Sequence, residues 1–172
     1  MINIEVFVKE FLAYIKNERA YTTDTVKNYM LDLQKFSVYS NKLGLTSINK
    51  IDCRHIQNYI KKLHQEGLSP TSIARKASAI RSMLAYSVKL GHIKHNPAKE
   101  IKTPKKTKLL PSVLSIEQIN LLCNIPLKSE TAIRDKAIIE LMYSSGLRLS
   151  ETTSLNNNSI DYDAKSLLVV GK

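Results

Sequence analysis

The sequence contains no tryptophan and only two cysteines, five glycines and five prolines among 172 residues. Cys53 and Cys123 are isolated, with no Cys-x-x-Cys and no paired histidines, so neither a disulfide framework nor a zinc site is expected. No apolar run approaches the roughly 18 residues of a membrane span, and the N-terminus lacks a signal-peptide pattern. The composition predicts a cytoplasmic, mostly helical protein with no metal centre and no membrane partner.

Acidic residues are scarce in the first two-thirds of the chain. Residues 1–110 hold twenty Lys and Arg against eight Asp and Glu, a balance of +12, whereas residues 111–172 hold six against seven, a balance of −1. This asymmetry predicts a polyanionic partner, with nucleic acid the first candidate. A generally basic soluble protein and a helical protein-interaction module are the alternatives. Membrane-surface binding is disfavoured because no helix combines a basic face with a strongly apolar, aromatic one.

Apolar residues at helical spacing predict four helices before residue 91, and a short fifth after it. The expected helices cover about residues 2–18, the stretch from Thr22 or Thr23 to Gly44, the stretch from Asp52 to Gly67, about residues 70–90, and a few residues from Asn96-Pro97.

The helix at 70–90 has two contrasting faces. Ile73, Ala77, Ile80 and Leu84 share one side, which must face the bundle. The opposite side gathers Thr71, Arg75, Ser78 and Ser82, flanked by Lys76 and Arg81, and no Asp or Glu occurs between Pro70 and Leu90. Such a small, hydroxylated and cationic edge suits contact with phosphates and base edges. An ordinary solvated face is the alternative.

Residues 101–111 read as a linker with four lysines and two prolines, suited to crossing a phosphate backbone, or simply solvated. Beyond it, Ser115-Ile-Glu-Gln118 is a capping box that opens a helix. A second helix is expected over residues 129–145, with Ile133, Ala137 and Leu141 inward and Ile138 as a further inward candidate. A lone, open-edged strand is expected over residues 166–170. The segment after residue 111 is expected to be less stable than the bundle and to expose apolar surface.

An arginine follows the end of the helix at 129–145. In the stretch from Leu141 to Glu151, Gly146 closes the helix, and Arg148 precedes a short helix that Ser150 could cap and Glu151 could favour. The planar guanidinium suits bidentate recognition of a phosphate. A surface pair between Arg148 and Glu151 is the alternative.

Five stretches in order and spacing resemble the tyrosine recombinases (phage integrase family), specifically the Xer type. They are Thr22–Leu33, Gly67–Arg81, Asn96-Pro-Ala98 with the lysine linker, Leu110–Ser115, and Leu141–Glu151 with Gly171-Lys172. The resemblance implies a mainly α protein. Residues 1–100 would form a SAM-like core-binding bundle of four to five helices, 101–111 a basic linker, and 112–172 the α+β start of a catalytic domain.

The resemblance implies site-specific DNA recombination through a 3′-phosphotyrosine, without ATP, metal or another cofactor. Arg148 and Lys172 match the family's first catalytic arginine and its lysine general acid, and Glu151 matches the acid that supports the arginine. The partners implied are double-stranded DNA and other recombinase subunits, in a homo- or hetero-tetramer on a synapse. The DNA contacts expected are Thr71, Arg75, Lys76, Ser78, Arg81, Lys102, Lys105 and Lys106.

Part of the family's catalytic set does not occur in these 172 residues. There is no His-x-x-Arg motif, and neither Tyr143 nor Tyr162 matches the nucleophile. Thr152 and Thr153 stand where the family usually has an apolar residue after the glutamate. The chain is therefore expected to be a DNA-binding fragment that cleaves nothing alone. The alternative is a non-catalytic regulator or competitor of a full-length recombinase.

Overall fold

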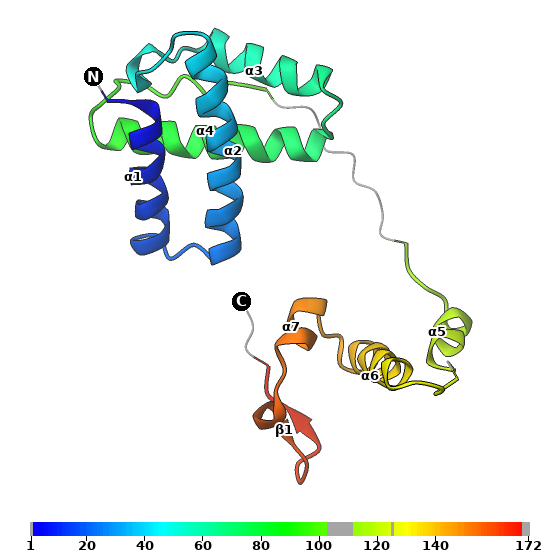
Figure 1. Ribbon diagram of the computed structural model, residues 1–172. Helices are drawn as coiled ribbons and strands as arrows, with labels where there is room; N and C mark the ends of the chain where they lie inside the picture. Colours follow the sequence, from blue (N-terminus) through cyan, green and yellow to red (C-terminus); the bar gives the residue numbers. More distant parts are fainter. Residues whose placement is uncertain (1, 103–111, 125, 170–172) are drawn as a thin grey trace. The chain divides into compact units, whose positions relative to one another are not determined.

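The computed structural model describes residues 2–102, 112–124 and 126–169, and the chain divides into two units, Met1–Leu109 and Leu110–Lys172 (Figure 1). The predicted linker at 101–111 lies outside the described residues except for Ile101 and Lys102. None of the described helices is both long and apolar enough for a bilayer span.

The first unit is a helical bundle whose helices begin at side-chain caps. It consists of α1 (Ile4–Asn17), α2 (Thr23–Lys42), a 3-10 turn η1 (Ile48–Lys50), α3 (Cys53–Gln65) and α4 (Pro70–Lys89). Asn3, Thr22, Asp52 and Ser69 each accept a hydrogen bond from a backbone N–H of the first turn, which satisfies donors that the helix itself leaves free. α1 packs chiefly against α2, and α4 contacts all three other helices (Figure 1).

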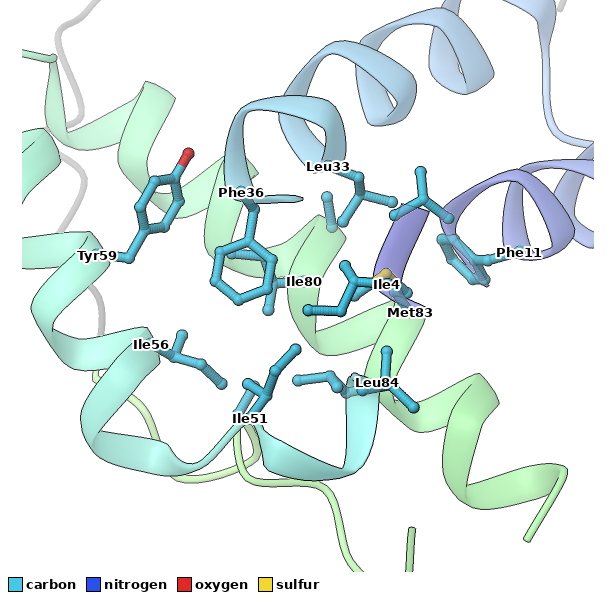
Figure 2. Close-up of a cluster of buried hydrophobic side chains, with 14 of the residues drawn as sticks. Ile4, Phe11, Leu33, Phe36, Ile51, Ile56, Tyr59, Ile80, Met83 and Leu84 are labelled. Atoms are coloured by element: carbon cyan, nitrogen blue, oxygen red, sulfur yellow. The ribbon is translucent and has the colours of Figure 1, made fainter. Parts of the chain in front are cut away.

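The core of this unit is built from one apolar face of each helix, and it includes the predicted inner face of α4, with Ile73, Ile80 and Leu84. Figure 2 shows Phe36 of α2, Ile56 of α3 and Ile80 of α4 pointing toward one another. Each large side chain that is fully buried contributes about 1.5–3 kcal/mol relative to exposure. The fully buried set includes Ile4, Phe7, Phe11, Leu33, Phe36, Ile48, Ile56, Ile73, Ile80, Met83 and Leu84.

The segment after α4 forms turns and not the short helix expected from Asn96. The Lys99 amide donates to the Asn96 carbonyl (3.2 Å) and the Ile101 amide to the Ala98 carbonyl (3.4 Å). The Asn96 side chain accepts from the Ala98 amide (2.9 Å) as a helix cap would, but both backbone bonds join residues three apart, which is the pattern of turns and not of an α-helix. The prediction of a helix here is therefore wrong.

The described residues of the second unit form three helices and a small hairpin. Its elements are α5 (Ile116–Cys123), α6 (Glu130–Ser145), α7 (Leu149–Ser154), a 3-10 turn η2 (Asn157–Ser159), β1 (Ile160–Asp161) and β2 (Ser166–Leu167). The capping box of Ser115 and Gln118 is present, as predicted. The strand expected over residues 166–170 is found only at Ser166–Leu167, with no strand at 168–169. It does not stand alone but pairs antiparallel, with Ile160 opposite Leu167 and Asp161 opposite Ser166.

The second unit has almost no interior within its described residues. Thr152 is its one buried side chain, and no large apolar side chain of residues 112–124 or 126–169 is buried. Ile133 is 54% exposed and Ala137 is also exposed, so their predicted inward placement is wrong. The reason is that α5 and α7 cover too little of α6 to enclose its apolar stripe. Among residues 112–124 and 126–169, twelve large hydrophobic side chains lie exposed: Val113, Leu114, Ile116, Leu121, Leu122, Leu127, Ile133, Tyr143, Leu149, Ile160, Tyr162 and Leu168.

Candidate nucleic-acid interface

The outer edge of α4 carries small, hydroxylated and cationic side chains and no carboxylate. Thr71, Arg75 and Lys89 are exposed, and Ser78 and Ser82 are half-buried, on the side opposite the buried Ile73 and Ile80. Thr71 and Lys89 are 18 residues apart, which is about five helical turns and about 27 Å along one line. We call this line, from Thr71 to Lys89 through Ala74, Arg75, Ser78, Ser82 and Ala85, the α4 edge.

Arg75 on the α4 edge forms an ion pair with a buried carboxylate on α2. Its Nη1 donates to Asp32 Oδ2 at 2.5 Å, while the Arg75 side chain stays 43% exposed and that of Asp32 only 1%. Asp32 Oδ1 accepts from Lys76 Nζ at 2.7 Å. One carboxylate therefore receives two cations, of which only Arg75 reaches the surface.

Lys76 does not lie where a DNA contact requires. Its side chain is 6% exposed and its ammonium is enclosed with Asp32 between α2 and α4. Lys76 is one residue further round the helix than Arg75, about 100°, and this rotation brings it to the bundle side. The structure therefore places the Lys76 ammonium inside the bundle and not on the α4 edge, where the DNA contact was expected.

Arg81 is also turned toward the protein. Its Nε donates to the Ala98 carbonyl (3.1 Å) and its Nη2 to the Ile101 carbonyl (3.2 Å), while the Asn96 side-chain amide donates to the Arg81 carbonyl (2.9 Å). Arg81 is half-buried. Arg81 thus attaches the segment before the linker to α4, and at least two of its N–H groups are engaged within the protein.

A hollow of about 280 Å³ adjoins the far end of the α4 edge, and sequence reasoning did not identify it. Arg19, Lys89 and Ser82 line it together with the rings of Tyr14 and Tyr86. The two rings stack at 4.1 Å between centroids, and Lys89 Nζ lies 5.0 Å from the Tyr14 ring centre. Burial raises the pKa of Tyr86, and the charges of Glu10 and Glu18 raise it further. The sequence did contain one indication of this extension: Lys89 lies 18 residues after Thr71, so helical periodicity places both on the same line of α4.

Three of the predicted cationic residues lie outside the described residues: Lys105, Lys106 and Lys172. Lys102 is described and exposed, directly after the Ile101 carbonyl that Arg81 holds.

In the second unit, Arg148 stands at the N-terminus of α7. Gly146 takes the left-handed conformation (φ 64°) that closes α6, and its amide donates to the Met142 carbonyl. The Arg148 side chain is 78% exposed, and its Nη1 donates to Glu151 Oε1 (2.8 Å). The Arg148 backbone amide donates to Glu151 Oε2 (2.8 Å). Arg148 is therefore the N-cap residue, and the predicted cap at Ser150 is wrong.

Thr152 fits the short helix despite its hydroxyl. The side chain is 8% exposed, and its Oγ1 donates to the Arg148 carbonyl at 3.2 Å. The Glu151 side chain is 15% exposed, so most of it is covered while the guanidinium it holds faces outward. An exposed guanidinium held on one edge by a carboxylate still offers donors for a phosphate. Within the described part of the chain, no group of three or more His, Cys, Asp or Glu could hold a metal ion.

Comparison with known proteins covers nearly the whole chain. The family model described as "Phage integrase, N-terminal SAM-like domain" matches residues 8–91, and that of the "Phage integrase family" matches residues 112–172. Tyrosine recombinase XerC of Proteus mirabilis is 36% identical over 169 residues, 98% of this chain and 55% of that protein. The XerC of Psychromonas ingrahamii is 37% identical over 172 residues, 100% of this chain and 58% of that protein. The chain thus spans little more than half the length of these relatives.

Solved integrase structures share the fold. The integrase of the Tn1549 transposon, in complex with circular intermediate DNA, aligns with a TM-score of 0.67 at 15% identity, covering 95% of this chain and 53% of that one. The integrase from mycobacterium phage Brujita aligns with a TM-score of 0.52 at 19% identity, covering 96% and 54%. The predicted fold class, mainly helical with a SAM-like N-terminal domain, is confirmed.

Proposed function

Since this chain belongs to the phage integrase family of tyrosine recombinases, we propose that it binds duplex DNA as part of a site-specific recombination reaction. The observation that carries the proposal is the α4 edge, which presents Arg75 and Lys89 without any carboxylate. The unit to which it belongs also holds the whole positive excess of the chain. Its named relatives are tyrosine recombinases, and one structural neighbour is a transposon integrase in complex with DNA.

We assign the DNA contacts to Thr71, Arg75, Ser78 and Lys89 on the α4 edge, and to Lys102, Lys105 and Lys106 on the linker. Hydroxyl groups and charged donors to phosphate oxygens fix the register of a protein on the duplex. Small residues such as Ala74, Ser78 and Ser82 allow the helix to lie close to a groove. Lys76 and Arg81 are left out of this set because both bind within the protein.

In the recombination reaction, Arg148 would neutralise charge that builds on the scissile phosphate. A positioned donor of this kind stabilises a transition state by about 3–4 kcal/mol. Glu151 would hold the guanidinium through the bonds described above, and Lys172 would protonate the departing 5′-hydroxyl. Tyr143 and Tyr162 are 58% and 76% exposed and belong to α6 and to the β1–β2 turn, and we assign neither as nucleophile.

Titration of the 172-residue protein with a fluorescent duplex, at several salt concentrations, tests the proposal. A steep fall of affinity with salt is expected, with a logarithmic slope of about −0.9 for each phosphate neutralised. Selection from a pool of random duplexes should enrich one sequence. Failure to bind duplex DNA even in dilute buffer would overturn the proposal.

A nicked suicide substrate tests DNA strand cleavage separately from DNA binding. The 172 residues alone should bind it without forming a covalent adduct, since no assigned nucleophile lies among them. An adduct that survives denaturing electrophoresis would contradict this, and peptide mapping would then identify the tyrosine. Assembly with further recombinase subunits is proposed only for DNA carrying two sites, and light scattering of such complexes would measure it.

A further inference from the structure

Asp32, Arg75 and Lys76 form a cluster in which one buried carboxylate binds two cations. A DNA contact by Arg75 does not by itself explain why the second cation, Lys76, is buried there. Asp32 is 1% exposed and receives Arg75 Nη1 on one oxygen and Lys76 Nζ on the other. The cluster holds two positive charges and one negative charge. Because Lys76 is buried with the carboxylate, the remaining positive charge belongs to the exposed member, Arg75.

We propose that Asp32 is a positioning residue for DNA recognition, and that Lys76 preserves the charge of Arg75 by neutralising Asp32 from the inside. This inference rests on the proposed function and names how one contact of it is made. Asp32 fixes one edge of the Arg75 guanidinium against α2. No other hydrogen bond of Arg75 is found within the described residues, so its remaining N–H groups are available to a backbone phosphate.

Fixing the guanidinium before DNA arrives reduces the conformational freedom that binding would otherwise remove. Without the charge of Lys76, the Asp32 carboxylate that positions Arg75 would also neutralise it. When Lys76 is present, the pair of Asp32 and Lys76 has no net charge. Arg75 therefore keeps its positive charge and can still displace a counterion from DNA. The two inner residues thus have separate effects, one on orientation and the other on charge.

Salt dependence and affinity separate these effects. Arg75→Ala and Lys76→Met should each lower the magnitude of the salt slope by about one phosphate equivalent. In Lys76→Met, Arg75 is present but neutralised by Asp32. The double variant Asp32→Asn with Lys76→Met removes both inner charges, and it should restore the wild-type slope. If Lys76 contacted DNA directly, this double variant would keep the reduced slope, and the proposal would be overturned.

Orientation is tested by a matched pair that differs in one acceptor. An asparagine at position 32 can still accept a hydrogen bond from Arg75, whereas a leucine cannot. Asp32→Leu with Lys76→Met should therefore bind about three- to tenfold more weakly than Asp32→Asn with Lys76→Met, at an equal salt slope. Equal affinity of the two double variants would refute the positioning role.

Controls separate these outcomes from a loss of folding and from a general effect of surface charge. Both double variants avoid an unpaired buried charge, and thermal unfolding followed by circular dichroism should show each folded at the assay temperature. Asp24→Asn removes one exposed carboxylate from the same helix without touching Arg75, and it should leave affinity within about twofold because exposed charges are screened. If the wild type binds DNA but Arg75→Ala changes neither slope nor affinity, this inference fails while the proposed function stands. If the wild type does not bind, both fail.

Discussion

Two arginines in this chain are held in the same way by carboxylates of different burial. Arg75 is fixed by Asp32 at 2.5 Å, and Arg148 by Glu151 at 2.8 Å. In each case the carboxylate binds one edge of the guanidinium while the rest faces outward. The Asp32 side chain is 1% exposed and that of Glu151 15%, and Arg148 itself is 78% exposed. The medium around Asp32 screens charge less, so its loss should cost more.

Alanine substitution of the two acids should therefore have unequal effects on stability. Asp32→Ala leaves Lys76 buried without its partner and should lower the free energy of unfolding of the bundle by about 3–5 kcal/mol. Glu151→Ala removes a capping interaction and should cost α7 about 1 kcal/mol. Hydrogen exchange, read separately for α2 and α7, measures both. Equal losses would contradict the burial argument.

Tyr59 is a buried residue whose hydroxyl has no hydrogen-bond partner among the described residues. Burial raises the pKa of Tyr59 well above its ordinary value of 10.0, and the charge of Asp32 raises it further. Above pH 10 the unfolded chain therefore releases this proton while the folded chain retains it. Stability should be unaffected by this group below pH 10 and should fall as pH rises beyond it.

Tyr59→Phe tests both consequences. At pH 7 the variant should match or exceed the wild-type stability, by up to about 1 kcal/mol, because an unpaired buried hydroxyl is removed. Above pH 10 its stability should fall less steeply than that of the wild type, and urea unfolding at successive pH values measures this. Tyr39 and Tyr86 also have raised pKa values, so some alkaline loss should remain. A clearly less stable variant at pH 7 would indicate a missing partner for the hydroxyl.

Among the elements, those with both a cap and an apolar stripe were predictable from the sequence. α3 begins after Asp52 and α4 at Pro70, as expected, and the side chains of Asp52 and Ser69 cap them. The outward placement of Thr71 and Arg75 also followed from helical periodicity. Lys76 and Arg81 were misplaced because their partners, Asp32 and the carbonyls of Ala98 and Ile101, are distant in sequence. Periodicity assigns a residue to a face but does not reveal what a long side chain reaches.

Some elements could not be predicted because their local signals competed. The Asn96-Pro97 pair reads as a helix start, yet the Asn96 side chain bonds the Ala98 amide and the chain forms turns. Asp161 begins an Asp-Tyr-Asp sequence of turn-forming composition, yet Ile160–Asp161 pairs with Ser166–Leu167. A two-residue strand has too little pattern for period-two alternation to be recognised.

The hydrogen bonds of Arg81 should stabilise the turn segment at residues 96–101. Arg81→Met keeps the apolar stem but loses two bonds to buried carbonyl groups, which should destabilise this segment by about 1–3 kcal/mol. Hydrogen exchange at the Ile101 amide should accelerate, and trypsin should cut sooner after Lys102. Arg54→Met, at an exposed arginine on α3, is a control that should leave both unchanged. Unchanged exchange at Ile101 in Arg81→Met would show that the turns hold themselves.

At the scale of the whole molecule, the two units differ in how much surface they bury. The first has nineteen residues in one buried apolar cluster, whereas the described part of the second has none. Hydrophobic burial is the dominant stabilising contribution in folding, so the second unit should open locally far more often.

Limited proteolysis of the 172-residue protein measures this difference. Trypsin should cut at Arg134 and Lys136 on α6 well before it cuts at Lys76 or Arg81 on α4. The dye ANS should bind the intact chain and lose most of its signal once the second unit is digested. Cleavage of both units at similar rates would contradict the difference in burial.

The bonds from Arg81 to the Ala98 and Ile101 carbonyls have a mechanical consequence. A load applied along the backbone beyond Ile101 would reach the middle of α4 through these two bonds, without first extending the turn segment. A pull on the chain beyond Ile101 would thus act on α4 at Arg81, six residues from Arg75 on the same helix.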